Sequence, residues 1–365
     1  MIKIAQPIIR KEEMQAVEKV LKSGMITQGP MVVEFEKKFA NFCGTKYAIA
    51  VNSGTAALHC ALYASGINEG DEVITTPFTF VATANSIIMQ RAKPVFVDIL
   101  PDTFNIDPIK IEEKITKKTK AILPIDLYGQ IYDVEAVDKI AKKYKLKIIE
   151  DACQAHGAEF NHRKAGVFGE MGCFSFYATK NMTTSEGGMV VTNNERYAEL
   201  VKRFRHHGQS EKTRYQYFDL GFNYRMTDIA AAIGIEQLKR IDDFNKKRIK
   251  NAQLLTKGLK NIKGLITPIT KKNYKHVFHQ YTIRVTNEFK ATRDELLNYL
   301  KEKEIGSAIF YPKPLHLCLH FGKMGYQKGD FPVSERMSKE VLSLPVHPYI
   351  SEKDIKHIIH TIKNI

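Results

Sequence analysis

The spacing of hydrophobic residues changes repeatedly along the first half of this chain. Five short and almost uninterrupted apolar runs have the length of buried strands, at 46–51, 72–76, 94–98, 121–126 and 147–151. Three segments between them have apolar residues at helical spacing, at 54–65, 81–90 and 133–144. Strands that alternate with helices favour a mainly parallel sheet covered by helices, which is an α/β fold.

The remaining segments extend this pattern at both ends. Helical spacing predicts further helices at 11–22, 30–42, 195–206, 227–260, 292–303 and 352–363. One more strand is expected at 280–285, and the regular alternation ends after residue 190. No internal repeat or low-complexity linker marks a boundary. We therefore expect a large domain at 1–245 and a smaller C-terminal α/β domain at 246–365.

Lys180 follows the apolar segment Cys173–Tyr177 and precedes the glycine pair Gly187–Gly188. The segment is typical of a buried strand, and the glycines permit close backbone approach, so a solvent-facing charge explains this lysine poorly. A partly desolvated lysine amine can lose its proton at neutral pH and condense with an aldehyde. Enzymes hold pyridoxal phosphate (PLP) in this way. The pattern therefore predicts that Lys180 bears this cofactor.

Two other strand ends supply groups that this cofactor needs. The strand 147–151 ends in Asp151, whose carboxylate can pair with the protonated pyridine nitrogen and keep the ring an electron sink. Another strand leads into Gly54 and Thr55, which open a helix. A helix N-terminus has free N–H groups and a partial positive charge, which suit a phosphate. Ser175, on the strand before Lys180, could add a hydroxyl.

Each of these features has an ordinary structural interpretation when it occurs alone. Ser-Gly-Thr before a helix is usually an N-cap, and an aspartate that ends a strand is usually a turn residue. A lone lysine is usually a solvated surface charge. Together, however, they lie at strand ends in an alternating pattern, where open α/β sheets bind ligands. The combination supplies partners for the phosphate, the ring nitrogen and the aldehyde, and it favours a PLP site.

At these motifs the chain resembles the DegT/DnrJ/EryC1/StrS family of PLP-dependent aminotransferases, which act on nucleotide-linked keto sugars. The resemblance covers nearly the whole length. It includes the segments Met25–Pro30, Ser53–Leu58, Pro77–Thr83, Leu127–Gln130, Glu150–Gln154, Phe174–Phe176 with Lys180, and Gly221–Met226. It implies an aspartate-aminotransferase-like fold, known as fold type I.

The resemblance also implies how the cofactor ring would be held. Phe80 would stack on the ring, and Asp151 would hold the ring nitrogen. Gln154 would contact the ring hydroxyl, and Lys180 would form the covalent bond with the aldehyde.

The resemblance places further groups around the phosphate. Gly54, Thr55 and Ser175 would bind it from the same chain, whereas Asn223 would reach the phosphate bound in a neighbouring subunit. The expected assembly is therefore a homodimer with shared active sites.

The reaction that the resemblance implies is transfer of an amino group from glutamate to a keto group of a nucleotide-linked deoxy sugar. This step belongs to the biosynthesis of amino sugars for surface polysaccharide or related glycans. Lys180 would move the proton between the substrate carbon and the cofactor. Arg225, Tyr311 and His316 are the candidates for substrate contacts. A lone histidine near proline is more often structural, so both interpretations of His316 stay open.

Several residues bear on whether the chain has a function other than transamination. Ser185 stands where the family often has glycine, and serine can adopt most turn conformations. Relatives with histidine at the lysine position resemble sugar dehydratases, so Lys180 favours transamination. A PLP-dependent lyase or desulfurase would share the cofactor site, but no cysteine has the setting that a desulfurase needs. A cofactor-sensing regulator would require a DNA-binding helix pair, for which the chain has no extra residues.

Composition agrees with an enzyme of this kind. The chain has 365 residues, of which 44% are hydrophobic, so it can bury a large core. It has neither an apolar run of membrane-spanning length nor the apolar stretch of a signal peptide, and we expect a cytoplasmic protein without membrane contact. The five cysteines lack metal-site spacing. We interpret them as reduced core residues, and no metal is expected.

The formal charge of +15 requires a separate explanation. The lysines are dispersed and lie mostly on amphipathic helices or their connections, which is typical of solvated helix faces rather than of nucleic-acid binding. A positive cleft would also suit a cofactor phosphate and a nucleotide diphosphate.

Overall fold

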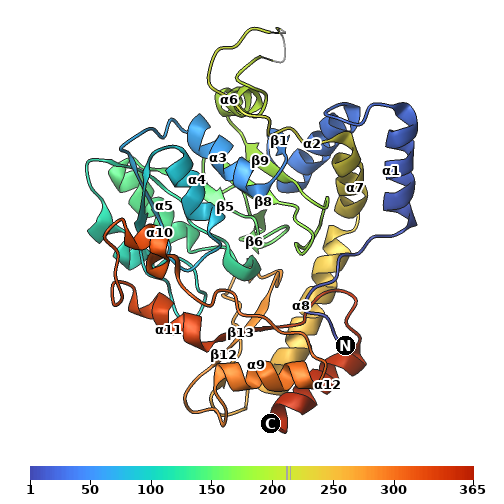
Figure 1. Ribbon diagram of the computed structural model, residues 1–365, viewed down its shortest axis with the longest axis vertical. Helices are drawn as coiled ribbons and strands as arrows, with labels where there is room; N and C mark the ends of the chain where they lie inside the picture. Colours follow the sequence, from blue (N-terminus) through green and yellow to red (C-terminus); the bar gives the residue numbers. More distant parts are fainter. Residues whose placement is uncertain (211–212, 214) are drawn as a thin grey trace.

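A computed structural model describes residues 1–210, 213 and 215–365. Its larger part is built on a seven-stranded sheet (Figure 1). In spatial order the strands are β1 (Tyr47–Val51), β9 (Gly188–Thr192), β8 (Met171–Ser175), β5 (Lys147–Asp151), β4 (Thr119–Ile122), β2 (Glu72–Thr75) and β3 (Lys93–Phe96). β9 is antiparallel to both of its neighbours, and the other pairs are parallel. The expected mainly parallel sheet is confirmed.

Helices cover both faces of this sheet. One face packs against α2 (Pro30–Cys43), α5 (Val134–Tyr144) and α7 (Asp228–Leu238). The other face packs against α3 (Gly54–Ala64), α4 (Ala82–Met89) and α6 (Glu195–Arg205). In β1, Ala48 and Ala50 belong to the first core, whereas Ile49 and Val51 belong to the second. Because side chains alternate along a strand, a sheet covered on both faces needs the continuous apolar runs seen in the sequence.

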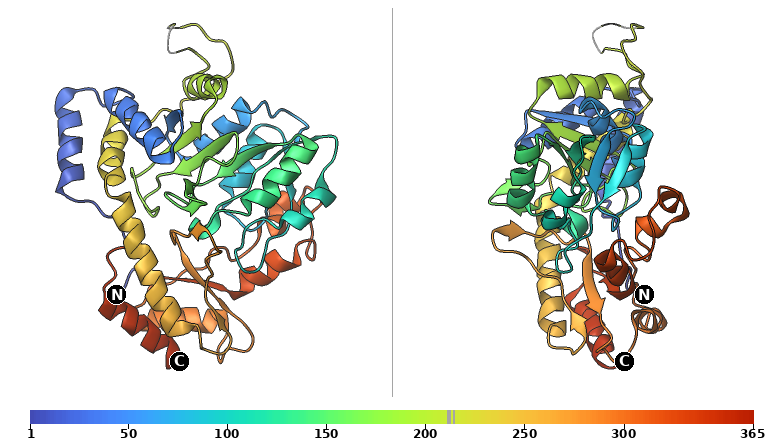
Figure 2. Two further views of the ribbon diagram at one scale, coloured as in Figure 1. Left: turned by 180° about the vertical axis from the view of Figure 1, so that it is seen from behind. Right: turned by 90° about the vertical axis from the view of Figure 1, so that its left-hand side faces the viewer.

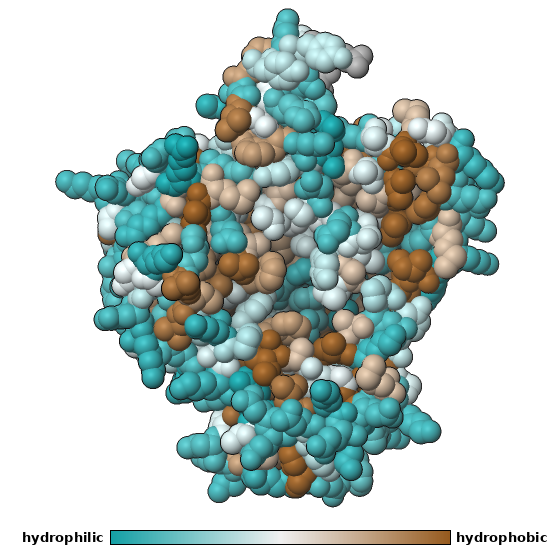
Figure 3. Space-filling model, in the orientation of Figure 1, coloured by the Kyte–Doolittle hydropathy of each residue, from teal (hydrophilic) through white to brown (hydrophobic). Residues whose placement is uncertain are grey.

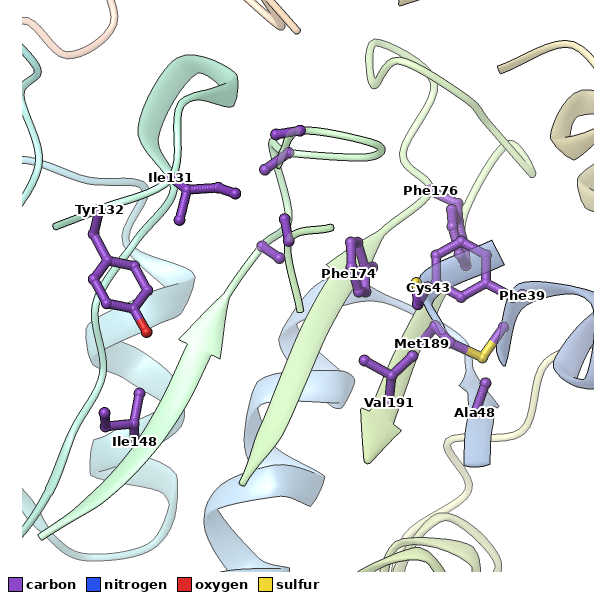
Figure 4. Packing of buried hydrophobic residues seen from close by; sticks show 14 of the residues in the cluster. Phe39, Cys43, Ala48, Ile131, Tyr132, Ile148, Phe174, Phe176, Met189 and Val191 are labelled. Carbon is purple, nitrogen blue, oxygen red and sulfur yellow. The ribbon is translucent and has the colours of Figure 1, made fainter. Parts of the chain in front are cut away.

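Aromatic side chains form the centre of the first core. Phe39 of α2 lies with its ring centroid 5.0 Å from that of Phe174 and 5.3 Å from that of Phe176, both at edge-on angles. Figure 4 shows these rings turned toward one another beside Cys43 and Met189. Edge-on pairs of this kind contribute about 1 kcal/mol each beyond their buried area. Burial also raises the pKa of the Cys43 thiol, so this cysteine stays a protonated core residue.

The C-terminal part has its own core. A three-stranded antiparallel sheet of β10 (Leu265–Ile266), β12 (Tyr281–Val285) and β13 (Val341–Leu344) contributes to it together with α8 (Ile241–Leu259), α9 (Arg293–Glu302) and α12 (Glu352–Lys363). Figure 2 shows α8 running from the sheet-containing part into this C-terminal part.

Smaller elements complete the fold. Three further helices are α1 (Lys11–Ser23), α10 (Leu319–Gly322) and α11 (Pro332–Glu340). A short antiparallel sheet is formed by β11 (Tyr274–Lys275), β6 (Glu159–Phe160) and β7 (Arg163–Lys164). Single turns of 3-10 helix lie at Pro108–Lys110, Glu112–Lys114, Leu127–Gly129 and Leu315–Leu317. Within the described ranges, no helix is both long enough and apolar enough to cross a bilayer.

The helix expected at 227–260 is wrong, because the structure contains two helices there, α7 and α8. Their separation at Lys239 and Arg240 lets the guanidinium of Arg240 pair with the buried carboxylate of Glu13 in α1. This contact is distant in sequence, so local helical spacing could not indicate it.

The division into domains at 1–245 and 246–365 stays a prediction. Residue 245 lies inside α8 rather than in a connection, and Ile2 forms a bridge with Ile305. The first residues of the chain therefore pack with the C-terminal part.

Candidate active site

A cavity of about 480 Å³ lies at the carboxyl ends of β5 and β8, beside the start of α3. Neighbouring strands that point the same way bring their ends to one edge of the sheet, which is why residues from distant motifs meet here. Tyr311, from the C-terminal part, closes the cavity. The predicted site residues that line it are Gly54, Thr55, Phe80, Asp151, Gln154, Ser175, Lys180 and Tyr311.

Lys180 lies in the turn that follows β8. Its backbone N–H donates to the carbonyl of Tyr177 at 2.9 Å, which fixes the turn. Protein surrounds the side chain, yet it remains partly accessible because it faces the cavity. Burial lowers the pKa of Lys180, while the neighbouring Cys153 and Asp151 oppose that shift. The structure therefore offers an amine that gives up its proton more readily than an exposed lysine does.

Asp151 ends β5 on the same edge of the sheet. Its carboxylate is buried, and each oxygen has a hydrogen-bond donor. The hydroxyl of Thr83 donates to Oδ2 at 2.7 Å, and the backbone N–H of Cys153 donates to Oδ1 at 3.2 Å. Donors of this kind favour the ionised carboxylate.

The first turn of α3 packs closely against β8. Ser53 caps this helix, since its hydroxyl accepts the N–H of Ala56 at 3.1 Å. A Cβ atom at Gly54 would lie 2.7 Å from Cβ of Ser175, which is closer than real Cβ contacts come. Position 54 therefore requires glycine. The helix start leaves the N–H groups of Gly54 and Thr55 without partners inside α3, so they can bind an anion.

Gln154 has a fixed orientation in the cavity wall. Its Oε1 accepts the N–H of Tyr128 at 2.9 Å, and its Nε2 donates to the hydroxyl of Tyr311 at 3.2 Å. An amide nitrogen carries two hydrogens, so one donor remains for a ligand. Phe80 lies at the mouth of the cavity, with 57% of its surface exposed and its ring 6.4 Å from that of Tyr311.

Comparison with known proteins places this geometry in a family. The model of the DegT/DnrJ/EryC1/StrS aminotransferase family matches residues 7–363. The chain belongs to this family. It is 38% identical to GDP-perosamine synthase of Caulobacter vibrioides, with 100% of this chain and 98% of that protein covered. It is 42% identical to the spore coat polysaccharide biosynthesis protein SpsC of Bacillus subtilis, with 98% of this chain and 95% of that protein covered.

A solved structure extends the likeness to the fold and the cofactor. The PLP form of Spr1654 from Streptococcus pneumoniae superimposes with a TM-score of 0.94 at 28% identity, covering 100% of this chain and 98% of that one. The expected fold class is therefore confirmed. The protein is a PLP-dependent sugar aminotransferase, so the expected enzyme class and cofactor are also confirmed.

The residues of the cavity fit PLP. The cavity combines a lysine amine with a lowered pKa, a buried carboxylate held by two donors, and the free N–H groups of a helix start. These groups suit an aldehyde, a protonated pyridine nitrogen and a phosphate respectively. The roles of the individual residues stay predictions.

Asn223 and Arg225 do not line this cavity. Asn223 is exposed, and its carbonyl accepts the side-chain amide of Asn52 at 3.3 Å near the end of β1. Arg225 lines a neighbouring groove of about 290 Å³, which shares Glu186 with the cavity. Its Nη1 donates to Nδ1 of His206 at 2.8 Å.

His316 also lies outside the cavity lining. It is fully buried, its Nε2 lies 3.0 Å from a carboxylate oxygen of Glu335, and its ring packs edge-on against Phe331. This position agrees with the structural interpretation that the sequence left open.

The serine at position 185 adopts a left-handed backbone conformation, with φ of 72°. Its N–H donates to the Thr183 hydroxyl at 2.9 Å, which helps to hold the turn. Relative to glycine, a serine in this conformation costs about 1 kcal/mol. The loop therefore keeps its turn despite the substitution.

Several residues of the cavity were not predicted as site residues. Thr79 and Thr83 lie in the same motif as Phe80, so their hydroxyls were available as a signal. His279 and Gln280 come from a segment without a motif, and only tertiary folding brings them to the cavity. Burial, and then the charge of Lys180, lower the pKa of His279 well below its usual value, so this imidazole is neutral. Across the described residues, no cluster of histidine, cysteine and carboxylate side chains could hold a metal ion.

Proposed function

We propose that this aminotransferase moves the amino group of glutamate to a keto group of a nucleotide-linked deoxy sugar, in the biosynthesis of amino sugars for surface polysaccharide or related glycans. The observation that carries the proposal is the pairing of Lys180 with Asp151 in one cavity of an aminotransferase fold. Relatives named GDP-perosamine synthase and dTDP-3-amino-3,6-dideoxy-alpha-D-galactopyranose transaminase support this class of substrate.

The roles of the residues follow from their chemistry. When bound, PLP supplies an electron sink for the bond that is cleaved at the substrate carbon. Asp151 would hold the proton of the ring nitrogen in place, and the start of α3 would hold the phosphate at Gly54 and Thr55 with Ser175 beside them. Lys180, with its lowered pKa, takes a proton from the substrate carbon and later returns one.

The face of Phe80 fits stacking against the cofactor ring, and the free N–H of Gln154 fits its hydroxyl. Tyr311 lines the same cavity and would contact the sugar. Among the described residues that line the cavity, Lys180 is the one lysine or arginine, and it is reserved for the aldehyde. The nucleotide diphosphate therefore needs cations from outside this cavity.

We propose further that the enzyme is a homodimer with shared active sites. Asn223 is exposed near the end of β1, and it would reach the phosphate in the neighbouring subunit. Arg225 lines the adjacent groove and would face the substrate diphosphate there.

The surface of this region supports association between subunits. Figure 3 shows a large apolar patch over the part of the molecule where Figure 1 places α2 and α7. The large apolar residues exposed in α1, α2 and the segment between them are Met14, Leu21, Met25, Ile26 and Val33. Contiguous apolar surface of this kind is typical of an interface.

The test is to incubate the PLP-loaded enzyme with glutamate and a panel of keto nucleotide sugars. We expect one sugar of the panel to be aminated with equal formation of 2-oxoglutarate, and NMR of the product would locate the amine. The Lys180→Ala variant is the control and should give neither product. Elimination products without 2-oxoglutarate would contradict the proposal and favour a lyase or dehydratase.

A further inference from the structure

Thr83 makes the shorter of the two hydrogen bonds to the carboxylate of Asp151. It lies in the first turn of α4, its side chain is 1% exposed, and its hydroxyl donates to Oδ2 at 2.7 Å. The other oxygen, Oδ1, accepts the N–H of Cys153 at 3.2 Å. The carboxylate of Asp151 is therefore held by one donor from α4 and one donor from the loop that follows β5.

A second hydroxyl lies behind Thr83. Oγ1 of Thr79 is 3.2 Å from Oγ1 of Thr83, and Thr79 is also buried. A hydroxyl has one hydrogen to donate, and an ionised carboxylate can only accept. Because Thr83 gives its hydrogen to Asp151, Thr79 must be the donor to Thr83. The two hydroxyls thus form a chain with one direction, which ends on Oδ2 of Asp151.

This direction has an electrostatic consequence. In a buried site a carboxylate without donors would take up a proton, whereas each hydrogen bond to its ionised form opposes that. The hydrogen bond of Thr83 is itself strengthened by accepting one from Thr79. The carboxylate of Asp151 is in this way fixed in orientation by groups of the protein alone.

We propose that Thr83, supported by Thr79, is a positioning residue that holds the carboxylate of Asp151 aimed into the cavity before PLP binds. The inference rests on the role of Asp151 at the ring nitrogen in the proposed function. Thr83 carries no charge, and although it lines the cavity, its hydroxyl hydrogen is given to Asp151. Its substitution should therefore change how tightly PLP binds and how its ring titrates.

The experiment compares Thr83→Val, which keeps the shape of the side chain but lacks the hydroxyl, with Thr83→Ser, which keeps the hydroxyl. Apoenzyme is titrated with PLP, and the visible absorbance of the bound cofactor is followed between pH 6 and pH 9. Thr83→Val should bind PLP about tenfold more weakly, as expected for loss of one hydrogen bond to a charged group. Its absorbance should depend on pH differently from wild type. Thr83→Ser should restore both properties.

Two further variants separate positioning from packing. Ser86→Ala is a matched control, because the buried Ser86 hydroxyl on the same helix donates to the Thr83 carbonyl at 2.8 Å and not to Asp151. It should leave PLP affinity and absorbance unchanged. Thr79→Val should shift both in the same direction as Thr83→Val but less, and it serves as the test if Thr83→Val does not fold.

Asp151→Asn distinguishes failure of this inference from failure of the proposed function. If Asp151→Asn weakens PLP binding and alters the absorbance while Thr83→Val and Thr79→Val match wild type, the inference is overturned and the role of Asp151 stands. If Asp151→Asn also matches wild type, the role of Asp151 in the proposed function is overturned. Equal losses in Thr83→Val and Thr83→Ser would show that packing rather than the hydroxyl matters, and would overturn the inference.

Discussion

Gln154 and Tyr311 join two parts of the chain across the cavity, with Nε2 of the glutamine donating to the tyrosine hydroxyl at 3.2 Å. Oε1 of the same glutamine accepts the N–H of Tyr128. A rotation that exchanged the amide oxygen and nitrogen would therefore lose a hydrogen bond. Burial raises the pKa of Tyr311, and the phenol therefore stays protonated. The contact fixes the edge of the C-terminal part relative to the loop that follows β5.

The Tyr311→Phe variant should raise KM for the sugar substrate about fivefold and leave PLP affinity near wild type. A neutral hydrogen bond contributes about 1 kcal/mol, and the donor left on Gln154 faces a cavity that water can enter. Steady-state kinetics and PLP titration would measure the two effects.

Tyr326→Phe is the matched control for this prediction. The hydroxyl of the half-buried Tyr326 has two partners, the carbonyl of Pro94 at 2.9 Å and the N–H of Phe96 at 3.2 Å, but it lies outside the cavity lining. It should lower the free energy of unfolding without changing KM. A Tyr311→Phe enzyme with an unchanged KM would show that the hydroxyl has no role in sugar binding.

The Lys180→Met variant should stabilise the cofactor-free enzyme in a way that depends on pH. Because burial lowers the pKa of Lys180, the unfolded chain binds more protons than the folded one between that lowered pKa and about 10.4. Lysine therefore costs the fold more stability as the pH falls through this interval. Methionine has no proton to bind, so the advantage of the variant should grow as the pH falls from about 10.4 to the lowered pKa of Lys180 and persist below it.

Urea unfolding of both cofactor-free proteins at several pH values would measure this difference. The variant should also fail to retain pyridoxyl label after borohydride reduction of the PLP-treated protein. Lys263→Met, at an exposed position, is the control and should leave stability unchanged. A Lys180→Met protein that loses its advantage toward pH 6 would contradict a buried amine, and label found on another lysine would contradict the site.

The sequence was sufficient to bring Lys180 and Asp151 to one edge of the sheet, because Asp151 ends one clear apolar run and Lys180 lies in the turn after another. Once the strands are recognised as parallel neighbours, their ends must meet at one edge of the sheet. The sequence does not predict the antiparallel strand β9, although Gly188–Thr192 is apolar. The glycine pair at its start is typical of a turn, and it is assigned to the turn that contains Lys180. β9 pairs with β8 and with β1, and β1 lies more than a hundred positions earlier in the chain. A local pattern could not indicate this pairing.

Other parts of the site could not be predicted for a similar reason. His279 reaches the cavity because the segment before β12 packs on the loop of Gly129, and no local pattern encodes that contact. The N–H of Val277 donates to the carbonyl of Gly129 at 3.0 Å, and a Cβ at Gly129 would lie 2.9 Å from the backbone nitrogen of His279. The position of His279 in the cavity therefore depends on tertiary packing.

Asp126 leads to a prediction about stability at high pH. It is fully buried, and burial, followed by the neighbouring Glu150, raises its pKa well above the usual value. Glu150 accepts N–H groups from Gly166 at 2.6 Å and Phe168 at 3.0 Å, so the negative charge is better placed there. Asp126 therefore keeps its proton in the folded state at a pH where the unfolded chain has lost it.

The sign of the effect follows from that difference. The folded state binds more protons than the unfolded state, so this residue contributes less stability as the pH rises. Asp126→Asn keeps the shape without a proton to lose, and it should be more stable than wild type by about 1–2 kcal/mol at pH 8. Chemical denaturation should show the difference shrinking toward pH 4. If the stability of Asp126→Asn relative to wild type is instead lowest at pH 8, Asp126 is ionised in the folded state.

The shared active site can be tested by mixing two inactive variants. Lys180→Ala removes the amine of a site, whereas Asn223→Asp places a negative charge where the neighbour's phosphate would lie. In a symmetric dimer, a chain of each kind together forms one site with both defects and one intact site. Random exchange makes half of the dimers mixed, so activity should return to roughly a quarter of the wild-type value.

Subunit exchange has to be shown first, for instance by purifying mixed dimers through two different affinity tags. The control mixes Lys180→Ala chains that carry both tags, and it should remain inactive because every site lacks the amine. Asn223 is exposed in the single chain, so its substitution should not alter the free energy of unfolding of that chain. If tagged mixed dimers form and their activity stays at the level of the unmixed variants, Asn223 acts within its own chain and each subunit has a complete site of its own.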